Sequence, residues 1–186
     1  MTLQPVKPRV LIVDDNPANR TAFKALLEEG YIVSAVESGP QALELSIREE
    51  FSVILLDIRM PVMDGYETAE LLRKRERTRY TPIIFMSAYD QSVAQIKKGY
   101  VAGATDFLAS PVDPELLLFK VSAYSQLHLR NEAMRVQIHQ LTGLIQTLQV
   151  ESALRTNAPE PEFRAKINQL EAMIEDLQRQ MSPVIR

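Results

Sequence analysis

The chain contains no cysteine, so it can form no disulfide framework and perform no thiol chemistry. No apolar run approaches the roughly 20 residues that a membrane-spanning helix needs. Residues 1–8 also lack the apolar core of a signal peptide. The formal net charge is -3, and no helix-turn-helix pattern or basic recognition helix is present. These absences predict a cytoplasmic protein that neither spans a membrane nor binds nucleic acid.

Strand-like and helix-like segments alternate as far as Pro111, in a chain of 186 residues with an ordinary globular composition. The strand-like runs are apolar nearly throughout, which is typical of parallel strands buried on both faces. Five such units predict a doubly wound α/β domain with a five-stranded parallel sheet. The predicted strands cover residues 9–13, 31–36, 51–56, 82–86 and 106–108; the predicted helices cover residues 17–29, 39–49, 65–76 and 91–98, the last ended by Gly99. A further helix should follow Asp113, because Asp113-Pro114-Glu115 supplies an N-cap, a first-turn proline and a first-turn acid.

Three carboxylates follow two of the predicted strands. Asp14 and Asp15 come after residues 9–13, and Asp57 comes after residues 51–56. Ligands of such sheets lie at the carboxyl ends of the strands, so we expect the three side chains to meet. Their mutual repulsion favours a bound cation, and hard oxygen ligands with open positions suit Mg²⁺, which also accepts phosphate oxygens. The pattern therefore favours phosphoryl chemistry with an Asp as acceptor over three solvated aspartates.

The last third of the chain has heptad periodicity. No proline and only one glycine, Gly143, occur between Pro114 and Leu154, so a single helix about 60 Å long is expected. Four consecutive apolar pairs indicate a coiled coil, with Asn131 as the polar residue that fixes register and a two-stranded, parallel state. The a positions are Tyr124, Asn131, Ile138 and Ile145, and the d positions are Leu127, Met134, Leu141 and Leu148. Because one small domain cannot bury such a helix, we expect a homodimer.

A segment with two prolines, residues 155–161, interrupts this helix, and Asn157 is a candidate cap within it. A second heptad run follows, with Phe163, Leu170 and Leu177 at d and Ile167, Ile174 and Met181 at a. Two arrangements remain open. The chain turns back as a helical hairpin, so that a dimer makes a four-helix bundle, or it continues as a stalk after a kink.

Residues 9–124 resemble the receiver domain of two-component response regulators. The resemblance rests on four motifs in a specific order and spacing, which are Val13-Asp14-Asp15-Asn16-Pro17, the run from Leu56-Asp57-Ile58-Arg59-Met60-Pro61 to Met63-Asp64-Gly65-Tyr66-Glu67, Met86-Ser87-Ala88, and Gly103-Ala104-Thr105-Asp106-Phe107-Leu108. It implies a flavodoxin-like sheet with strand order 2-1-3-4-5.

The resemblance also implies roles for individual residues. Asp57 would accept a phosphoryl group from a histidine kinase or phosphotransfer protein. Asp14 and Asp15 would hold Mg²⁺ together with Asp57 and the backbone carbonyl of Arg59. Ser87 would donate a hydrogen bond to the phosphoryl group, and Phe107 would be the aromatic residue that moves on activation.

One departure from the family pattern concerns a lysine that usually precedes the proline after the last strand. This position is Ser110, in Ala109-Ser110-Pro111. Without the lysine a fixed positive charge is missing, although Lys97 or Lys98 could in principle reach the site. Phosphorylation of Asp57 remains expected, but its coupling to Ser87 and Phe107 is weakened. The resemblance further implies a cis Ser110–Pro111 bond.

Two other features favour structural interpretations. His139 lies beside an a position and His128 is expected at the surface, so neither is preferred as a phosphotransfer site. The basic run at residues 73–79 is interpreted as a solvated helix end, where cations interact favourably with the helix dipole.

The predicted organisation is a tail at 1–8, a receiver at 9–124, a coiled-coil helix at 125–154, a break at 155–161 and a second amphipathic helix at 162–186. The expected function is signalling: phosphorylation of Asp57 acts through a dimeric coil, and no separate output enzyme is expected. The alternatives are a degenerate receiver that serves as a phosphorylation-independent scaffold, and the N-terminal part of a larger signalling protein.

Overall fold

The computed structural model describes residues 7–88, 92–154 and 161–181. It contains two compact units, Met1–His128 and Leu129–Arg186, which we describe separately. The expectations for most of the N-terminal tail, for Gln91, for the Asn157 cap and for the last five residues fall outside the described residues.

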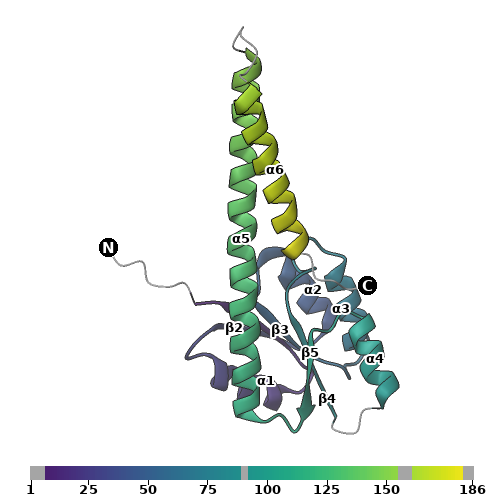
Figure 1. The fold of residues 1–186 in the computed structure, drawn as a ribbon. Coiled ribbons are helices and arrows are strands. Elements are labelled where there is room, and N and C mark those ends of the chain that lie inside the picture. Colours follow the sequence, from purple (N-terminus) through teal and green to yellow (C-terminus); the bar gives the residue numbers. More distant parts are fainter. Residues whose placement is uncertain (1–6, 89–91, 155–160, 182–186) are drawn as a thin grey trace. The chain divides into compact units, whose positions relative to one another are not determined.

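The first unit is a doubly wound α/β domain, as predicted (Figure 1). Its five strands are all parallel and have the order β2-β1-β3-β4-β5, which confirms the expected topology. The strands are β1 (Arg9–Val13), β2 (Ile32–Val36), β3 (Val53–Asp57), β4 (Ile83–Ala88) and β5 (Asp106–Ser110), and the helices between them are α1 (Pro17–Leu27), α2 (Gly39–Arg48), α3 (Gly65–Arg73) and α4 (Val93–Val101).

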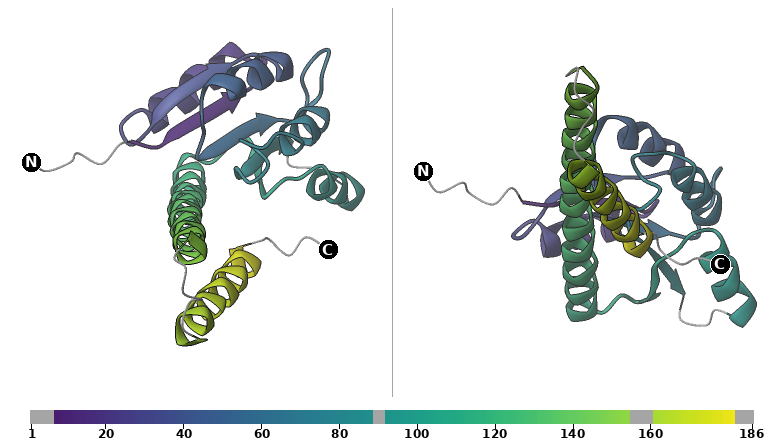
Figure 2. Two further views of the ribbon diagram at one scale, coloured as in Figure 1. Left: turned by 90° about the horizontal axis from the view of Figure 1, so that it is seen from above. Right: turned by 45° about the horizontal axis from the view of Figure 1, so that its top comes forward.

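The central strands are buried on both faces, which explains their unbroken apolar sequences. On one face, Leu11, Ile54 and Phe85 pack against residues of α2 and α3. On the other face, Ile12 and Leu55 pack against residues of α1 and α5. Helices therefore cover both sides of the sheet (Figure 2), and its ladder of parallel strands brings all carboxyl ends to one edge.

The predicted end of α4 at Gly99 is wrong. The helix continues through this glycine to Val101. Gly99 is buried against β5: a Cβ there would lie 2.4 Å from the Phe107 Cζ atom. The glycine thus provides space for a neighbouring ring rather than a helix terminus.

Helix α5 (Pro114–Leu154) begins as expected, with the Leu116 N–H donating to Asp113 Oδ1 at 2.9 Å. Its first turns belong to the receiver, because Leu117 and Val121 are fully buried in the second sheet face. Tyr124, predicted at a coiled-coil a position, instead donates from its hydroxyl to Asp106 Oδ2 at 3.0 Å. The first residue of the heptad run, Tyr124, therefore packs with the receiver domain instead of the coiled coil.

The second unit contains the distal part of α5 and helix α6 (Pro161–Met181), which pack as a hairpin (Figure 1). Four isoleucines at a positions are 6–8 % exposed and form one cluster, with Leu177 beside them. They are Ile138 and Ile145 of α5 and Ile167 and Ile174 of α6. Gln149 Nε2 donates to Glu171 Oε1 at 2.9 Å across the same pair of helices. Of the two predicted arrangements, the hairpin is the one that the described residues adopt.

Within the described part of the chain, no helix has both the length and the apolar character needed to span a membrane.

Candidate functional site

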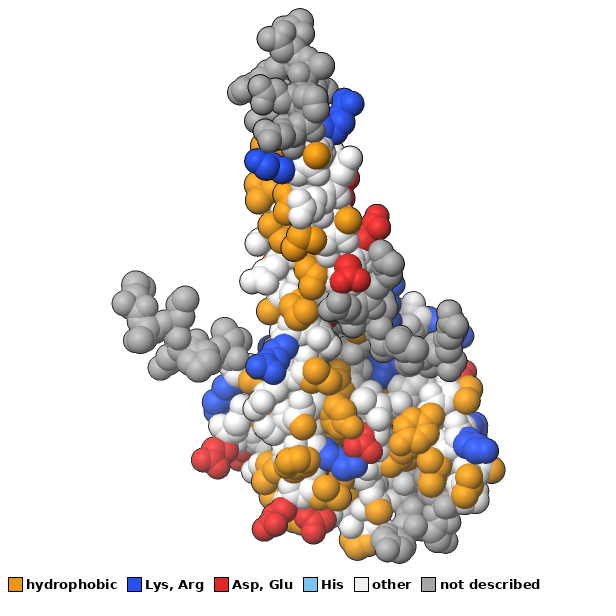
Figure 3. All heavy atoms as spheres, viewed as in Figure 1, with side chains coloured by type: hydrophobic (Ala, Val, Ile, Leu, Met, Phe, Trp, Pro, Cys, Tyr) orange, Lys and Arg blue, Asp and Glu red, His pale blue; other side chains and the backbone are white. Residues whose placement is uncertain are grey.

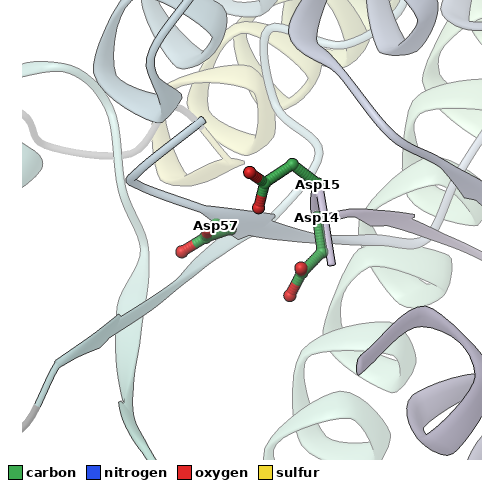
Figure 4. Close-up of side chains that lie close together, drawn as sticks. All are labelled: Asp14, Asp15 and Asp57. Carbon is green, nitrogen blue, oxygen red and sulfur yellow. The ribbon is translucent and has the colours of Figure 1, made fainter. Parts of the chain in front are cut away.

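Three carboxylates meet at the carboxyl edge of the sheet, as predicted (Figure 4). Val13 pairs with Leu56, so the residues that follow them lie side by side. One carboxylate oxygen from each of Asp14, Asp15 and Asp57 lies within 4.8 Å of the other two. Asp14 is buried, Asp57 is half-buried and Asp15 is exposed, so the cluster opens to solvent on one side.

Asp14 is held in place by the start of α1. The Asn16 N–H donates to its Oδ1 at 2.8 Å, and Asn19 Nδ2 donates to its Oδ2 at 3.0 Å. Arg20 Nη1 donates to the Asp14 carbonyl oxygen at 2.6 Å. Sequence reasoning missed Asn19 and Arg20. The sequence contained one indication of their role. Pro17 starts a helix, and the first turn of that helix places the polar side chains of Asn19 and Arg20 near the end of β1.

The cluster is short of positive charge. Burial, followed by the neighbouring carboxylate of Asp14, raises the pKa of Asp57 to about 6, although the backbone amide of Arg59 acts in the opposite direction. Burial also raises the pKa of Asp14, against the hydrogen bond from Asn16. The charge of Arg20 lowers the pKa of Asp14, but burial outweighs it, and the pKa of both carboxyl groups is raised overall. Such a site favours a cation, because a nearby positive charge stabilises the ionised carboxylates.

Ser87 lies on β4, the neighbour of β3, and Phe107 lies on β5, one strand further from the acidic cluster. Ser87 is buried at the end of β4 and directly follows Met86, which pairs with Asp57. Phe107 on β5 pairs with Phe85 in the strand register. Its ring centroid is 5.7 Å from that of Phe85 and 5.1 Å from that of Tyr100 on α4. The aromatic side chain thus connects the sheet edge to the exposed helix α4.

Gly65, predicted only as the start of a helix and as part of a family motif, lies directly against the acidic cluster. A Cβ at this position would lie 2.3 Å from the Asp57 carbonyl oxygen. Its N–H donates to the Ile58 carbonyl at 2.9 Å. Asp64 then caps α3 by accepting from the Glu67 N–H at 2.8 Å. Glycine allows α3 to start directly against the backbone of Asp57.

Ser110 occupies the position where receivers carry a lysine. It is exposed at the end of β5, and the Ser110–Pro111 bond is cis, as expected. Lys98, a possible substitute, lies 4.2 Å from the centre of the Tyr66 ring and 4.0 Å from Asp64. Lys120 is bound to Asp106 at 2.6 Å and to the Phe107 carbonyl at 2.8 Å. Both cations therefore have other contacts.

The remaining candidates are outside the site. His139 is exposed on α5, as expected. The basic run after α3 is less solvated than predicted, because several of its arginines donate to backbone carbonyls. Arg75 donates to the Leu43 carbonyl and Arg77 donates to the Ile47 carbonyl, so both bind the carboxyl end of α2.

A doubly wound sheet with an aspartate triplet at its carboxyl edge defines a class of phosphoryl-handling domains. The chain belongs to the response regulator receiver domain family, whose match covers residues 10–122. Its fold is similar to the chemotaxis protein CheY4 of Vibrio cholerae, with a TM-score of 0.62 and 32% identity over 64% of this chain and 99% of that one. The receiver domain of the sensor histidine kinase PA1611 from Pseudomonas aeruginosa, which has a coordinated magnesium ion, gives a TM-score of 0.60 and 33% identity over 65% of this chain and 99% of that one.

Longer relatives share only part of their length with this chain. Response regulator PleD of Caulobacter vibrioides is 36% identical over 128 residues, which are 68% of this chain and 28% of that protein. Sensor histidine kinase GacS of Pseudomonas protegens is 34% identical over 169 residues, which are 88% of this chain and 18% of that protein. The chain thus spans less than a third of these relatives.

Proposed function

We propose that this chain is a phosphorelay receiver whose Asp57 accepts a phosphoryl group from a histidine kinase or a phosphotransfer protein. The observation that carries the proposal is the meeting of Asp14, Asp15 and Asp57 within one small cluster. The membership of the chain in the receiver family supports it. The chain acts as a phosphoryl acceptor and is not an enzyme with an output reaction of its own.

The donor set fits Mg²⁺. Three hard carboxylate oxygens lie close enough to share a cation, and a cation would offset the burial and the repulsion from Asp14 that raise the pKa of Asp57. Asp14, Asp15, Asp57 and the backbone carbonyl of Arg59 would hold the ion. When bound, Mg²⁺ supplies charge that offsets the oxygens of the transferred phosphoryl group.

The chain's own residues provide position and orientation. Asn19 and the Asn16 amide fix the Asp14 carboxylate, and Gly65 keeps α3 close behind Asp57. Ser87 follows the residue that pairs with Asp57, and this position supports its proposed role of donating a hydrogen bond from its hydroxyl to the phosphoryl group. Positioning of this kind supplies much of the catalysis in phosphoryl transfer.

Signalling would proceed through Phe107 and the helices. Phe107 contacts Tyr100 on α4, and its carbonyl accepts from Lys120 on α5. We propose that α5 carries the signal to a homodimer formed by the C-terminal helices. With Ser110 in place of lysine, this receiver is atypical, and the coupling between Asp57 and Phe107 lacks one fixed charge.

The proposal is tested by the intact mass of the chain after incubation with acetyl phosphate and Mg²⁺. We expect one phosphoryl adduct in the wild type and none in Asp57→Asn. Asp64→Asn, which changes a carboxylate outside the triplet, is the matched control and should keep the adduct. An unmodified wild-type mass, together with no Mg²⁺ binding, would refute the proposal.

The second candidate is a degenerate receiver that serves as a scaffold, alone or as the N-terminal part of a larger signalling protein. Ser110 is the observation that favours it. Beryllofluoride with Mg²⁺ separates the candidates. A changed environment of Phe107 in NMR spectra supports the switch, and unchanged spectra support the scaffold.

A further inference from the structure

The C-terminal hairpin exposes a row of apolar side chains that its own core does not use. On α5, Leu141, Leu144 and Leu148 follow the i, i+3, i+7 spacing of one helix side. On α6, Leu170 and Met173 are three residues apart. Exposed fractions are 39% for Met134, 47% for Leu141, 61% for Leu144, 41% for Leu148, 46% for Leu170 and 57% for Met173. Figure 3 shows hydrophobic side chains along this part of α5.

These residues share one broad face of the hairpin. In both helices the a positions form the intramolecular seam, which Leu177 joins from a d position, and the six exposed residues named above occupy d and g positions. Two antiparallel helices that meet along the same heptad position are related by a twofold axis perpendicular to the hairpin. Side chains at equal heptad positions consequently lie on the same face. We call the residues Met134, Leu141, Leu144, Leu148, Leu170 and Met173 the d/g face.

The buried core of the hairpin is too small to stabilise the whole C-terminal unit by itself. Among its described residues, only the four isoleucines are less than 9 % exposed. Units with so little buried apolar surface usually need oligomerisation or another staple. An apolar face rimmed by polar residues is the usual mark of an interface between proteins.

We infer that the d/g face binds the same face of a second copy of this chain and thereby forms a four-helix bundle. The seven-residue repeat of Met134, Leu141 and Leu148 gives a surface with regular layers, which an identical hairpin can match by twofold symmetry. The opposite side of α5 carries the exposed polar residues His139 and Gln146, together with two separate exposed valines, Val136 and Val150.

The charge of the unit also favours a second copy over a lipid surface. Residues 129–186 contain as many Asp and Glu as Lys and Arg. Helices that lie on anionic membranes are instead rich in Lys and Arg on the polar face. The four-helix bundle deepens the homodimer suggested under Proposed function, but it does not depend on phosphoryl transfer.

The test is the mass of the full, unphosphorylated chain in solution by light scattering. We expect a dimer for the wild type and a monomer for Leu141→Lys/Leu148→Lys. The matched control is His139→Lys/Gln146→Lys, which places two lysines seven residues apart on the opposite side and should remain dimeric. A monomeric wild type at micromolar concentrations, a dimeric face variant or a monomeric control would overturn the inference.

A second measurement shows that the hairpin forms within one chain. The protein has no cysteine, so Gln149→Cys/Glu171→Cys introduces the only two thiols. These positions are hydrogen-bonded at 2.9 Å in the hairpin. A short bis-maleimide crosslinker should join them within a single chain, as seen on a denaturing gel. Products that contain two chains would indicate a continuous stalk and overturn the four-helix bundle. An Asp57→Asn chain should give the same masses, so a failure of phosphoryl transfer can be distinguished from a failure of the bundle.

Discussion

The ring of Phe107 occupies the space that a side chain on Gly99 would need: a Cβ there would lie 2.4 Å from Cζ and 2.9 Å from Cε1. Helix α4 and strand β5 therefore approach each other only because residue 99 is glycine. Phe107, which we propose transmits the signal, thus packs directly against α4.

Gly99→Ala should displace Phe107 and destabilise the receiver by about 1–3 kcal/mol, the usual cost of overpacking. Urea unfolding measures the loss, and NMR of the Phe107 ring reports the displacement. Val101→Ala, at a position that is 87% exposed, is the control and should change little. Phe107→Leu should restore part of the stability in the Gly99→Ala background; simple additivity of the two changes would argue against a shared space.

Asp57 should make the stability of the metal-free protein depend on pH. Its pKa is about 6 in the folded state and 3.8 ordinarily, so folding favours the protonated form. Stability should then fall as pH rises between these values and stay low above about 6. Asp57→Asn should stabilise the metal-free chain at pH 7.5 by about 1–2 kcal/mol, after allowance for solvent screening.

The effect of Mg²⁺ on thermal stability tests the same carboxylate in a second way. Mg²⁺ should raise the melting temperature of the wild type at pH 7.5 and have much less effect on Asp57→Asn, because a ligand that binds only the folded state stabilises it. Equal shifts in both chains would show that the ion does not use this carboxylate.

The Arg73 side chain should stabilise the receiver by joining α3 to the loops that precede β4 and β5. Burial lowers its pKa to about 10, so it remains charged at neutral pH. Its guanidinium donates to the carbonyls of Gly103 at 2.6 Å and Thr81 at 2.6 Å, and to that of Thr78 at 3.0 Å.

Arg73→Lys should cost about 2 kcal/mol, since an ammonium cannot reach these separate acceptors with fixed geometry. Chemical denaturation measures the change, and Lys74→Ala, in an exposed neighbour, should be nearly neutral. A lysine variant as stable as the wild type would show that charge alone is sufficient.

Val62 has an unfavourable backbone conformation in the loop after Asp57. Its φ is 70°, in a region that β-branched residues rarely adopt, and its side chain is 99% exposed. Val62→Asn should therefore stabilise the receiver by about 1 kcal/mol in thermal unfolding. Val62→Ile keeps the branched Cβ and should give no gain.

Gly143 should weaken α5 without contributing to packing. A Cβ there meets nothing within 4 Å. Gly143→Ala should raise the stability of the second unit by about 1 kcal/mol because alanine loses less backbone entropy in a helix. Circular dichroism during heating measures this, and Ala133→Gly at another exposed position should have the opposite effect.

The receiver fold could be predicted because its signals are local. Apolar runs define β1 and β3, and Asp14 and Asp57 follow them directly, so parallel pairing was enough to bring the acids together. The end of α4 could not be predicted in the same way. Gly99 is an ordinary helix stop in sequence, and its contact with Phe107 depends on tertiary packing.

Prediction from the heptad pattern was limited in a similar way. The pattern identified Ile138 and Ile145 as seam residues but contained no information on which helix they would meet. Tyr124 fitted the repeat too, yet its hydroxyl binds Asp106 in the receiver. Periodicity defines which residues share a helix face, whereas the partner of that face is decided by the rest of the fold.

The placement of Leu117 and Val121 in the sheet core has a consequence for how the chain is made. These residues are synthesised after the last strand, yet they cover the face formed by Val10, Ile12 and Leu55. A nascent chain, or a fragment that ends near Pro114, would hold a complete sheet with this apolar face covered only by α1. Such a species would be prone to aggregation. Release of the first turns of α5 from the ribosome is therefore the point at which this receiver can first become soluble on its own.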